Sequence, residues 1–250
     1  MLGAAAVLTV RAGWGLTARD KTQWGVSGST AQLLADINEL LQWRLDAHPG
    51  LPLFLLGHSM GGGAALTYAH EGALRGSLAG VAVWSPLIEP AAAARPSRLL
   101  VAAGRLAARL LPNAQRVEAL DPATMSRDPA VCADFARDPL CHNTGTLLGM
   151  SEMLARGECL ARADTAAAFA PDLPVLVCHG SADMVADCAA SRRFVAALAG
   201  ADTTFREYAG WRHKLHAEPE PDRTRFATEM VKWIRERAGA SAPAGGTPKL

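Results

Sequence analysis

The sequence predicts an α/β fold, in which a mostly parallel sheet is flanked by helices and carries an inserted helical cap. Short apolar runs of strand length alternate along the chain with segments whose apolar residues recur at helical spacing. This alternation stops in the middle of the chain, where short helices rich in Ala, Leu and Arg replace it. With 250 residues, the chain is long enough for one large domain with a sizeable core.

The first elements are expected to be a strand and a helix. Residues Met1–Val10 are apolar, lack the basic flank of a signal peptide and are too short to span a bilayer, so we predict a buried strand. Ser29 to Gln32 resemble a capping box, and leucines then recur at helical spacing until His48-Pro49-Gly50 ends the pattern. This segment predicts an amphipathic helix that leads into the next strand.

The remaining strands and helices follow from the same periodicity. The runs predicted as strands are Leu51–Leu56, Leu78–Trp84, Leu173–Cys178 and Thr203–Tyr208. Helices are expected over about 189–199 and 222–236, and the second has Phe226, Met230, Trp233 and Ile234 on one face. Strands that alternate with helices in this way favour a parallel sheet.

These elements divide the chain into three parts. Residues 1–88 and 171–238 are expected to form the core domain, 89–170 the helical cap, and 239–250 a disordered tail rich in Gly, Ala and Pro. Within the cap, the segment 99–111 has a broad apolar stripe interrupted by arginines. The stripe either packs on the cap's own core or forms an amphipathic lid that touches lipid.

The composition narrows the class of partner. The formal net charge of +1 favours neither a nucleic-acid partner nor an acidic surface, and it is compatible with a small neutral or apolar substrate. The five cysteines include no C-x-x-C pair and no zinc-like spacing, so we expect reduced thiols in an intracellular protein. The sequence also has no HExxH motif, and we expect neither a metal nor a cofactor.

The most informative motif is Gly57-His58-Ser59-Met60-Gly61. It follows a predicted strand and opens a small-residue helix, which is the context of the nucleophile elbow in α/β-hydrolases. Glycines at both ends are expected to leave room around a strained serine. The sequence therefore predicts Ser59 as a nucleophile, with the backbone N–H of Met60 as an oxyanion donor.

The acid and the base are expected further along the chain, in that order. Asp183 follows the predicted strand that ends near Cys178, at the same sheet edge as Ser59, and would orient a histidine and stabilise its imidazolium form. His213 and His216 both follow the last predicted strand, and periodicity does not choose between them as general base. The other histidines lie in the wrong chain order or on other elements, so we interpret them as structural or exposed.

From about Gly13 to Ile234, the chain resembles the monoacylglycerol lipases. These belong to a serine-hydrolase class that also includes lysophospholipases and proline-type aminopeptidases, and the fungal forms are the most alike. The segments that carry the resemblance are Gly57–Gly62, Ser85–Ile88, Leu111–Asn113, Asp138–Cys141, His179–Asp183 and Gly210–His213. The resemblance implies Ser59, Asp183 and His213 as the catalytic triad, with His216 as a neighbour.

The resemblance also implies missing parts. Family members begin with further strands, one of which ends in a His-Gly turn whose loop helps to form the oxyanion hole. This chain starts after that point, so we expect an amino-terminally truncated form of the fold with a gap beside the strand before Ser59. The family's Asp-x-Arg-Gly element is also altered, since the chain has Val10-Arg11-Ala12-Gly13.

The resulting functional hypothesis is a carboxylic-ester hydrolase that cleaves monoacylglycerol through an acyl-enzyme on Ser59. The alternatives are a lysophospholipase, another esterase or a peptidase of the same fold, or a catalytically impaired fragment without the oxyanion strand. We expect a cytoplasmic protein that contacts membranes or lipid droplets through its cap. The ending Pro248-Lys249-Leu250 is a degenerate match to a peroxisomal signal, which leaves the peroxisome as a minor alternative.

Overall fold

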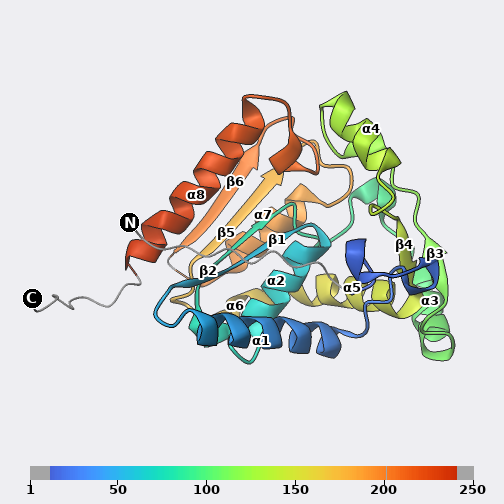
Figure 1. Cartoon of the computed structure of the whole chain (residues 1–250), viewed down its shortest axis with the longest axis horizontal. Helices are drawn as coiled ribbons and strands as arrows, with labels where there is room; N and C mark the ends of the chain where they lie inside the picture. The colour runs from blue at the N-terminus through green and yellow to red at the C-terminus, as the bar shows by residue number, and fades with distance from the viewer. Residues whose placement is uncertain (1–11, 201, 241–250) are drawn as a thin grey trace, which may run out of the picture.

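The computed structural model describes residues 12–200 and 202–240, in which helices cover a parallel sheet and a group of cap helices lies to one side (Figure 1). The strand predicted for Met1–Val10 lies outside the described residues. Within them, no helix is both long and apolar enough to cross a membrane.

The main sheet of the described residues has four strands in the order β1-β2-β5-β6, and every neighbouring pair is parallel. The strands are β1 (Leu53–His58), β2 (Leu78–Trp84), β5 (Val175–Gly180) and β6 (Thr203–Tyr208). All four agree with the prediction from sequence, and the bounds of β2 and β6 are as expected. β1 and β5 begin two residues later than the apolar runs, directly after Pro52 and Pro174, because proline has no N–H to donate to a ladder.

Helices cover both faces of this sheet (Figure 1). They are α1 (Thr30–Ala47), α2 (Met60–Glu71), α7 (Cys188–Ala197) and α8 (Asp222–Ala240). The strands alternate between two apolar clusters: Val81 and Val83 of β2 pack with α1, α2 and α7, whereas Ala82 faces the cluster that contains Trp233 of α8. The central strands are thus buried on both sides, as a parallel sheet requires.

The helix signals in the sequence are mostly confirmed. The Ser29 side chain accepts a hydrogen bond from the Gln32 N–H at 3.2 Å and so caps α1 as predicted. The predicted disordered tail, however, starts too early, because α8 continues through Gly239 and ends at Ala240. A Cβ at Gly239 would meet no other atom within 4 Å, so packing does not require a glycine at this position. Residues 241–250 lie outside the described residues.

Residues between the core strands β2 and β5 form helices and a small sheet, most of which lie at the right of Figure 1, whereas the last helix, residues 163–167, lies below the main sheet in that view. The elements are α3 (Arg98–Leu110), β3 (Gln115–Val117), α4 (Pro129–Arg137), β4 (Thr144–Thr146), α5 (Leu147–Leu160) and α6 (Ala163–Ala167). β3 and β4 pair in an antiparallel arrangement that the sequence does not predict. Leu160, Ala166 and Phe169 pack into the main core, so the last part of this segment supports the sheet.

Short 3-10 helices complete the described chain. They are Gly15–Thr17, Lys21–Gln23, Arg75–Ser77, Ala92–Ala94, Pro122–Thr124 and Leu215–Ala217.

The apolar stripe of α3 faces solvent. Leu99 is 84% exposed, Leu106 59% and Leu110 73%, whereas Ala108 on the opposite side is buried. The interpretation that these leucines pack on the cap's own core is therefore wrong. α3 instead packs beside α5, and an ion pair joins Arg105 to Glu158.

Candidate active site

The site begins at the sharp turn between β1 and α2, where Ser59 has a left-handed φ of 53°. A serine is rarely found in this region, so the turn is strained and must be held by its surroundings. The Ser59 N–H donates to the Trp84 carbonyl at 3.1 Å, and its own carbonyl accepts from Gly63 at 3.0 Å and Leu87 at 2.9 Å. These bonds tie the turn to the end of the neighbouring strand β2.

Two glycines allow the turn to be this tight. A Cβ at Gly57 would lie 2.3 Å from the Gly61 carbonyl oxygen, and one at Gly62 would lie 3.0 Å from Pro86. A Cβ at Gly61 would meet no other atom within 4 Å, so the expected role of this glycine in leaving room around Ser59 is not supported. The close approach of β1 to α2 thus depends on Gly57, and that of α2 to the loop after β2 depends on Gly62.

The ends of three parallel strands bring Ser59, Asp183 and His213 together. They follow β1, β5 and β6, whose carboxyl ends meet at the same sheet edge. Nε2 of His213 lies 2.8 Å from the Ser59 Oγ, and Nδ1 of His213 lies 2.8 Å from the Asp183 Oδ2. The three side chains therefore form a continuous hydrogen-bonded chain of hydroxyl, imidazole and carboxyl groups.

The Asp183 carboxyl group is completely buried and fully hydrogen-bonded. Its Oδ1 accepts the N–H groups of Val185 at 2.8 Å and Ala186 at 3.0 Å, while Oδ2 faces both His213 and His179. Burial alone raises the pKa of Asp183, but the hydrogen bonds from His179 and His213 outweigh it and hold this pKa well below its usual range. Asp183 is thus a carboxylate at neutral pH.

His216 lies close to His213 but faces a different partner. Its Nδ1 accepts the indole N–H of Trp84 at 2.9 Å, and its ring packs edge-on against His58 with centroids 5.0 Å apart. His216 is exposed on one side, and its other side packs against the rings of His58 and Trp84. Desolvation, the nearby Lys214 and His213 together lower the pKa of His216 to about 4.

His58 supports the backbone of His213. Its Nε2 lies 3.1 Å from the His213 carbonyl oxygen, to which it donates, and the two rings are 4.8 Å apart. Burial, with His213 and His216 nearby, holds the pKa of His58 well below its ordinary value. Any positive charge in this cluster of imidazoles is therefore not carried by His58 or His216 at neutral pH.

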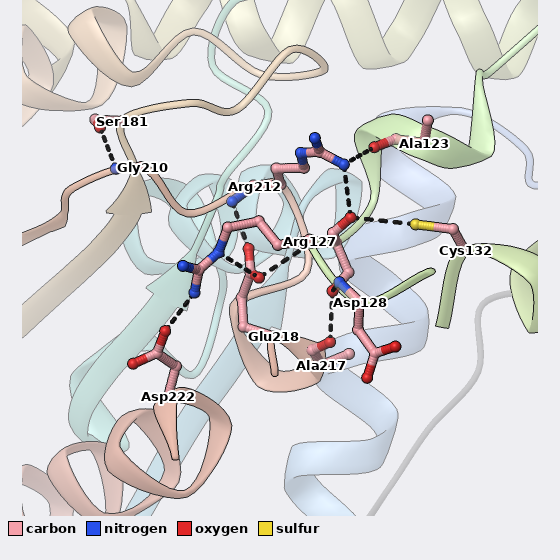
Figure 2. Close-up of polar contacts among 11 residues, drawn as sticks. Ala123, Arg127, Asp128, Cys132, Ser181, Gly210, Arg212, Ala217, Glu218 and Asp222 are labelled. Carbon is pink, nitrogen blue, oxygen red and sulfur yellow. Dashed lines mark hydrogen bonds and ion pairs between the residues drawn. The ribbon is translucent and has the colours of Figure 1, made fainter. Parts of the chain in front are cut away.

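The loop that carries His213 is anchored by a buried carboxylate, that of Glu218 (Figure 2). Glu218 has no exposed surface, and its Oε1 accepts the Arg212 N–H at 2.5 Å. Its Oε2 accepts the Nε and the backbone N–H of Arg127 at 2.9 and 3.1 Å. Arg127 also pairs with Asp222 at the start of α8.

Further bonds join the same loop to the segment before α4 (Figure 2). Nη1 of Arg212 donates to the carbonyls of Ala123 at 2.6 Å and Ser126 at 2.8 Å, and the Ser126 hydroxyl donates to Ala217 at 2.7 Å. The Lys214 N–H donates to Met125 at 2.7 Å. The cap segment and the histidine loop therefore form one hydrogen-bonded unit.

Two groups that touch this site or its loop are not found by sequence reasoning. His179 is predicted to be structural or exposed, and its burial agrees with the structural alternative, but its contact with Asp183, four residues away in the same turn, is not predicted. The spacing of four residues between His179 and Asp183 is the feature of the sequence that could have indicated this contact. Glu218 gives no signal at all, because its partner Arg127 is 91 residues away and no periodicity reports such a pair. Among the described residues, no group of three or more His, Cys, Asp or Glu side chains is arranged so that it could hold a metal ion.

Comparison with known proteins identifies the family. The model of the family described as serine aminopeptidase, S33, matches residues 5–220. The chain belongs to this S33 hydrolase family. Its sheet and its nucleophile turn are those of the α/β-hydrolase fold, as predicted.

Relatives of the chain include proteins named for monoacylglycerol cleavage. The chain is 33% identical over 219 residues to a protein of Schizosaccharomyces pombe that carries the name monoglyceride lipase, covering 87% of this chain and 56% of that protein. It is 31% identical to a monoacylglycerol lipase of Mycolicibacterium smegmatis, covering 82% of this chain and 69% of that one. The chain thus spans little more than half the length of the fission-yeast relative.

A solved structure has the same fold over most of the chain. A soluble variant of the monoglyceride lipase of Saccharomyces cerevisiae, in complex with a substrate analogue, matches with a TM-score of 0.83 and 26% identity. The match covers 91% of this chain and 76% of the yeast chain.

The low pKa of His216 predicts how the stability of this S33 hydrolase changes with pH. In the unfolded chain His216 takes up a proton near its ordinary pKa of 6.5, but in the folded chain only near 4. The unfolded state therefore binds more protons between these values, and the free energy of unfolding should fall as pH is lowered from about 6.5 to about 4. His58 acts in the same direction.

Urea unfolding across this pH range measures the effect. The His216→Asn variant keeps an acceptor for Trp84 but does not titrate, so its stability should depend less steeply on pH. Equal slopes for the two proteins would contradict the assignment of His216 as a neutral, desolvated group.

The Arg127–Glu218 pair predicts a large cost for losing one partner. Arg127→Met leaves the buried Glu218 carboxylate without its guanidinium and should reduce the free energy of unfolding by about 3 kcal/mol, the lower end of the usual range because Arg127 is one-third exposed. The double variant with Glu218→Gln should lose less than the sum of the single losses. Chemical unfolding measures both.

Arg137→Met is the matched control, since its pair with Asp134 is almost fully solvated. This variant should lose less than about 1 kcal/mol. Additive losses at Arg127 and Glu218, or equal losses at Arg127 and Arg137, would show that the buried pair does not hold the loop.

Proposed function

We propose that the chain is a serine hydrolase that cleaves carboxylic esters, with monoacylglycerol as substrate. The observation that carries this proposal is the chain of two 2.8 Å contacts from Ser59 through His213 to Asp183. The relatives named as monoglyceride and monoacylglycerol lipases support the choice of substrate.

The first half of the reaction transfers the acyl group to the enzyme. His213 Nε2 takes the proton of the Ser59 hydroxyl while Oγ bonds to the ester carbonyl carbon and the carbonyl electrons move to its oxygen. The tetrahedral intermediate then collapses. The bond between carbon and the glycerol oxygen breaks, and His213 gives its proton to the leaving oxygen.

The second half returns the enzyme to its starting state. Water gives a proton to His213 Nε2 and bonds to the acyl carbon, and the collapse of this intermediate breaks the bond to the Ser59 Oγ. The serine oxygen takes the proton back, and the fatty acid leaves. The reaction is a net hydrolysis, and it requires no cofactor.

The electrostatics of the site suit these proton transfers. Asp183 is ionised, so it holds the proton of His213 on Nδ1 and stabilises the imidazolium that forms in each half. The neighbouring His58 and His216 stay neutral, since their pKa values are lowered, and they add no repulsion when His213 becomes charged. We assign the triad roles to Ser59, Asp183 and His213 on this basis.

We assign the oxyanion to the start of α2. Met60 is the first residue of this helix and follows Ser59 directly, so its backbone N–H belongs to the end of the helix dipole that favours negative charge. Because Met60 directly follows Ser59 in the turn, its N–H lies next to the nucleophile.

We also propose that α3 contacts a lipid surface. Its exposed leucines form a continuous apolar face, and Arg98 and Arg109 on the same helix complement anionic headgroups. A lipid substrate reaches the site from such a surface. In this proposal the protein acts in the cytoplasm and attaches to membranes or lipid droplets reversibly.

The nucleophile and base assignments give a direct test. Ser59→Ala should abolish monoacylglycerol hydrolysis and labelling by a serine-directed phosphonate, while the fold stays intact because only one hydroxyl is removed. His213→Ala should lower kcat by about 10³-fold or more. Fatty-acid release from a monoacylglycerol measures the rates, and circular dichroism checks the fold.

His216→Ala is the control for the base, and its rate should change far less than that of His213→Ala. A larger loss at His216 would move the base to that residue. Turnover of a lysophospholipid or a peptide with none of a monoacylglycerol would overturn the substrate assignment, whereas a wild-type chain that does not label would overturn the hydrolase assignment.

The lipid contact predicts reduced vesicle binding when the apolar face is removed. The variant Leu99→Gln/Leu106→Gln/Leu110→Gln should bind more weakly to vesicles that contain phosphatidylserine, because it lacks the three leucine side chains that would be buried in the membrane interface. Cosedimentation measures binding, and hydrolysis of a water-soluble short-chain ester should be unchanged. Equal cosedimentation of wild type and variant would refute the contact.

A further inference from the structure

The Asp183 carboxylate is shared by two histidines, only one of which contacts Ser59. Oδ2 of Asp183 lies 2.8 Å from Nδ1 of His213 and 3.2 Å from Nε2 of His179. His179 is the penultimate residue of β5, and its ring has no exposed surface. A buried imidazole on the far side of the acid is not needed to form the three-residue chain, so its contact requires a separate explanation.

The surroundings of His179 fix which of its nitrogens carries the proton. Nε2 faces two acceptors, the Asp183 Oδ2 and the Ala186 carbonyl oxygen at 3.3 Å, so this nitrogen must be a donor. Nδ1 lies 2.8 Å from the Ser191 hydroxyl, which is also fully buried. In a neutral ring, Nδ1 is then the acceptor and Ser191 the donor.

We propose that His179, with its tautomer set by Ser191, is a positioning residue that holds the Asp183 carboxylate in the orientation in which it meets His213. This inference rests on the proposed hydrolase function. Two backbone N–H groups fix Oδ1, and His179 fixes Oδ2, so the carboxylate cannot rotate away from the His213 Nδ1. Ser191 and His179 thereby extend the hydrogen-bonded chain by two buried groups behind the acid.

The position of the Asp183 carboxylate determines how well it stabilises the imidazolium form of His213. Without the His179 N–H, Oδ2 is free to turn away from the His213 Nδ1, so the carboxylate should stabilise this imidazolium less. The acid limb of kcat/KM reports the protonation of the base in the free enzyme, so it should move to lower pH.

Other titratable groups near the pair do not produce the same shift. Cys188 lies near Asp183, but burial raises the pKa of its thiol to about 11. His58 and His216 face His213 and are neutral, while Lys214 adds a constant positive charge. Within the described residues, His179 is thus the group whose replacement should change the Asp183–His213 interaction directly.

The test compares two replacements of His179 in the full chain. His179→Met fills a similar volume without a donor, whereas the amide of His179→Gln can place an N–H close to the position of Nε2. The Met variant should lose about 10- to 100-fold in kcat, as expected for a lost hydrogen bond to a charged group, and its acid limb should move to lower pH. The Gln variant should restore most of the rate and the wild-type limb.

The substrate for these measurements is a short-chain p-nitrophenyl ester, and phosphonate labelling counts the folded sites. If His179→Met does not fold, Ser191→Ala provides the second variant, because it removes one hydroxyl and leaves the ring in place. It should move kcat and the acid limb in the same direction by a smaller amount. Tyr68→Phe is its matched control: it also removes a buried hydroxyl, with partners Asn38 and Leu74, but lies towards the far end of α2 from Ser59.

The outcomes separate the two proposals. Lower stability with unchanged kcat and pH profile per labelled site in the His179→Met and Ser191→Ala variants would overturn the positioning role and leave the hydrolase function standing. A wild-type chain that reacts with neither the ester nor the phosphonate would overturn the hydrolase function, and the positioning role with it. Turnover of the ester without turnover of a monoacylglycerol would overturn only the proposed substrate, and the comparison of His179 variants would still decide the positioning role.

Discussion

The strained turn at Ser59 is the constraint on which the rest of the structure depends. A serine at φ 53° is held there by bonds to Trp84, Gly63 and Leu87, which belong to the next strand, the following helix and the loop after that strand. The turn therefore requires β1, β2 and α2 to be packed together in their native positions. The absence of a side chain at Gly57 completes this requirement, because any Cβ there would overlap the backbone of Gly61. The geometry at Ser59 thus depends directly on the packing of the sheet.

The parallel pairing of the strands brings the proposed acid and base close to the serine. His213 lies 154 residues after Ser59 in the chain and Asp183 lies between them, but each follows a strand that ends at the same sheet edge. The loop that carries His213 is irregular, so its position needs further bonds. Glu218 supplies them by binding the backbone beside His213 and the side chain of Arg127 at once. Arg127, a cap residue, therefore helps to position His213 through Glu218, without touching His213.

How much of this could be read from the sequence depends on the range of each interaction. The elbow, the capping serine of α1 and the four strands are local patterns, and the structure has them close to where they are expected. The choice between His213 and His216 is not local. Periodicity places both after β6, and they are separated by their partners in the fold, which are Ser59 and Asp183 for His213 and Trp84 for His216. The three-residue strands β3 and β4 are too short to show a period of two, and the partners of Glu218 are too distant in the chain to show any pattern.

His213 differs from its neighbours His58 and His216 in its environment, although all three are histidines. The ring of His58 lies 4.8 Å from that of His213 and 5.0 Å from that of His216, yet His58 donates to a carbonyl and His216 accepts from an indole, and both have lowered pKa values. Of these three rings, only that of His213 has a hydroxyl on one nitrogen and a carboxylate on the other. Because a positive charge is favourable next to a carboxylate and costly beside apolar surfaces, a proton taken from Ser59 in the proposed reaction would have one stable place to go. In the proposed reaction, the proton would therefore stay on His213 and not pass to the neighbouring histidines, because the folded backbone supplies a different set of partners to each ring.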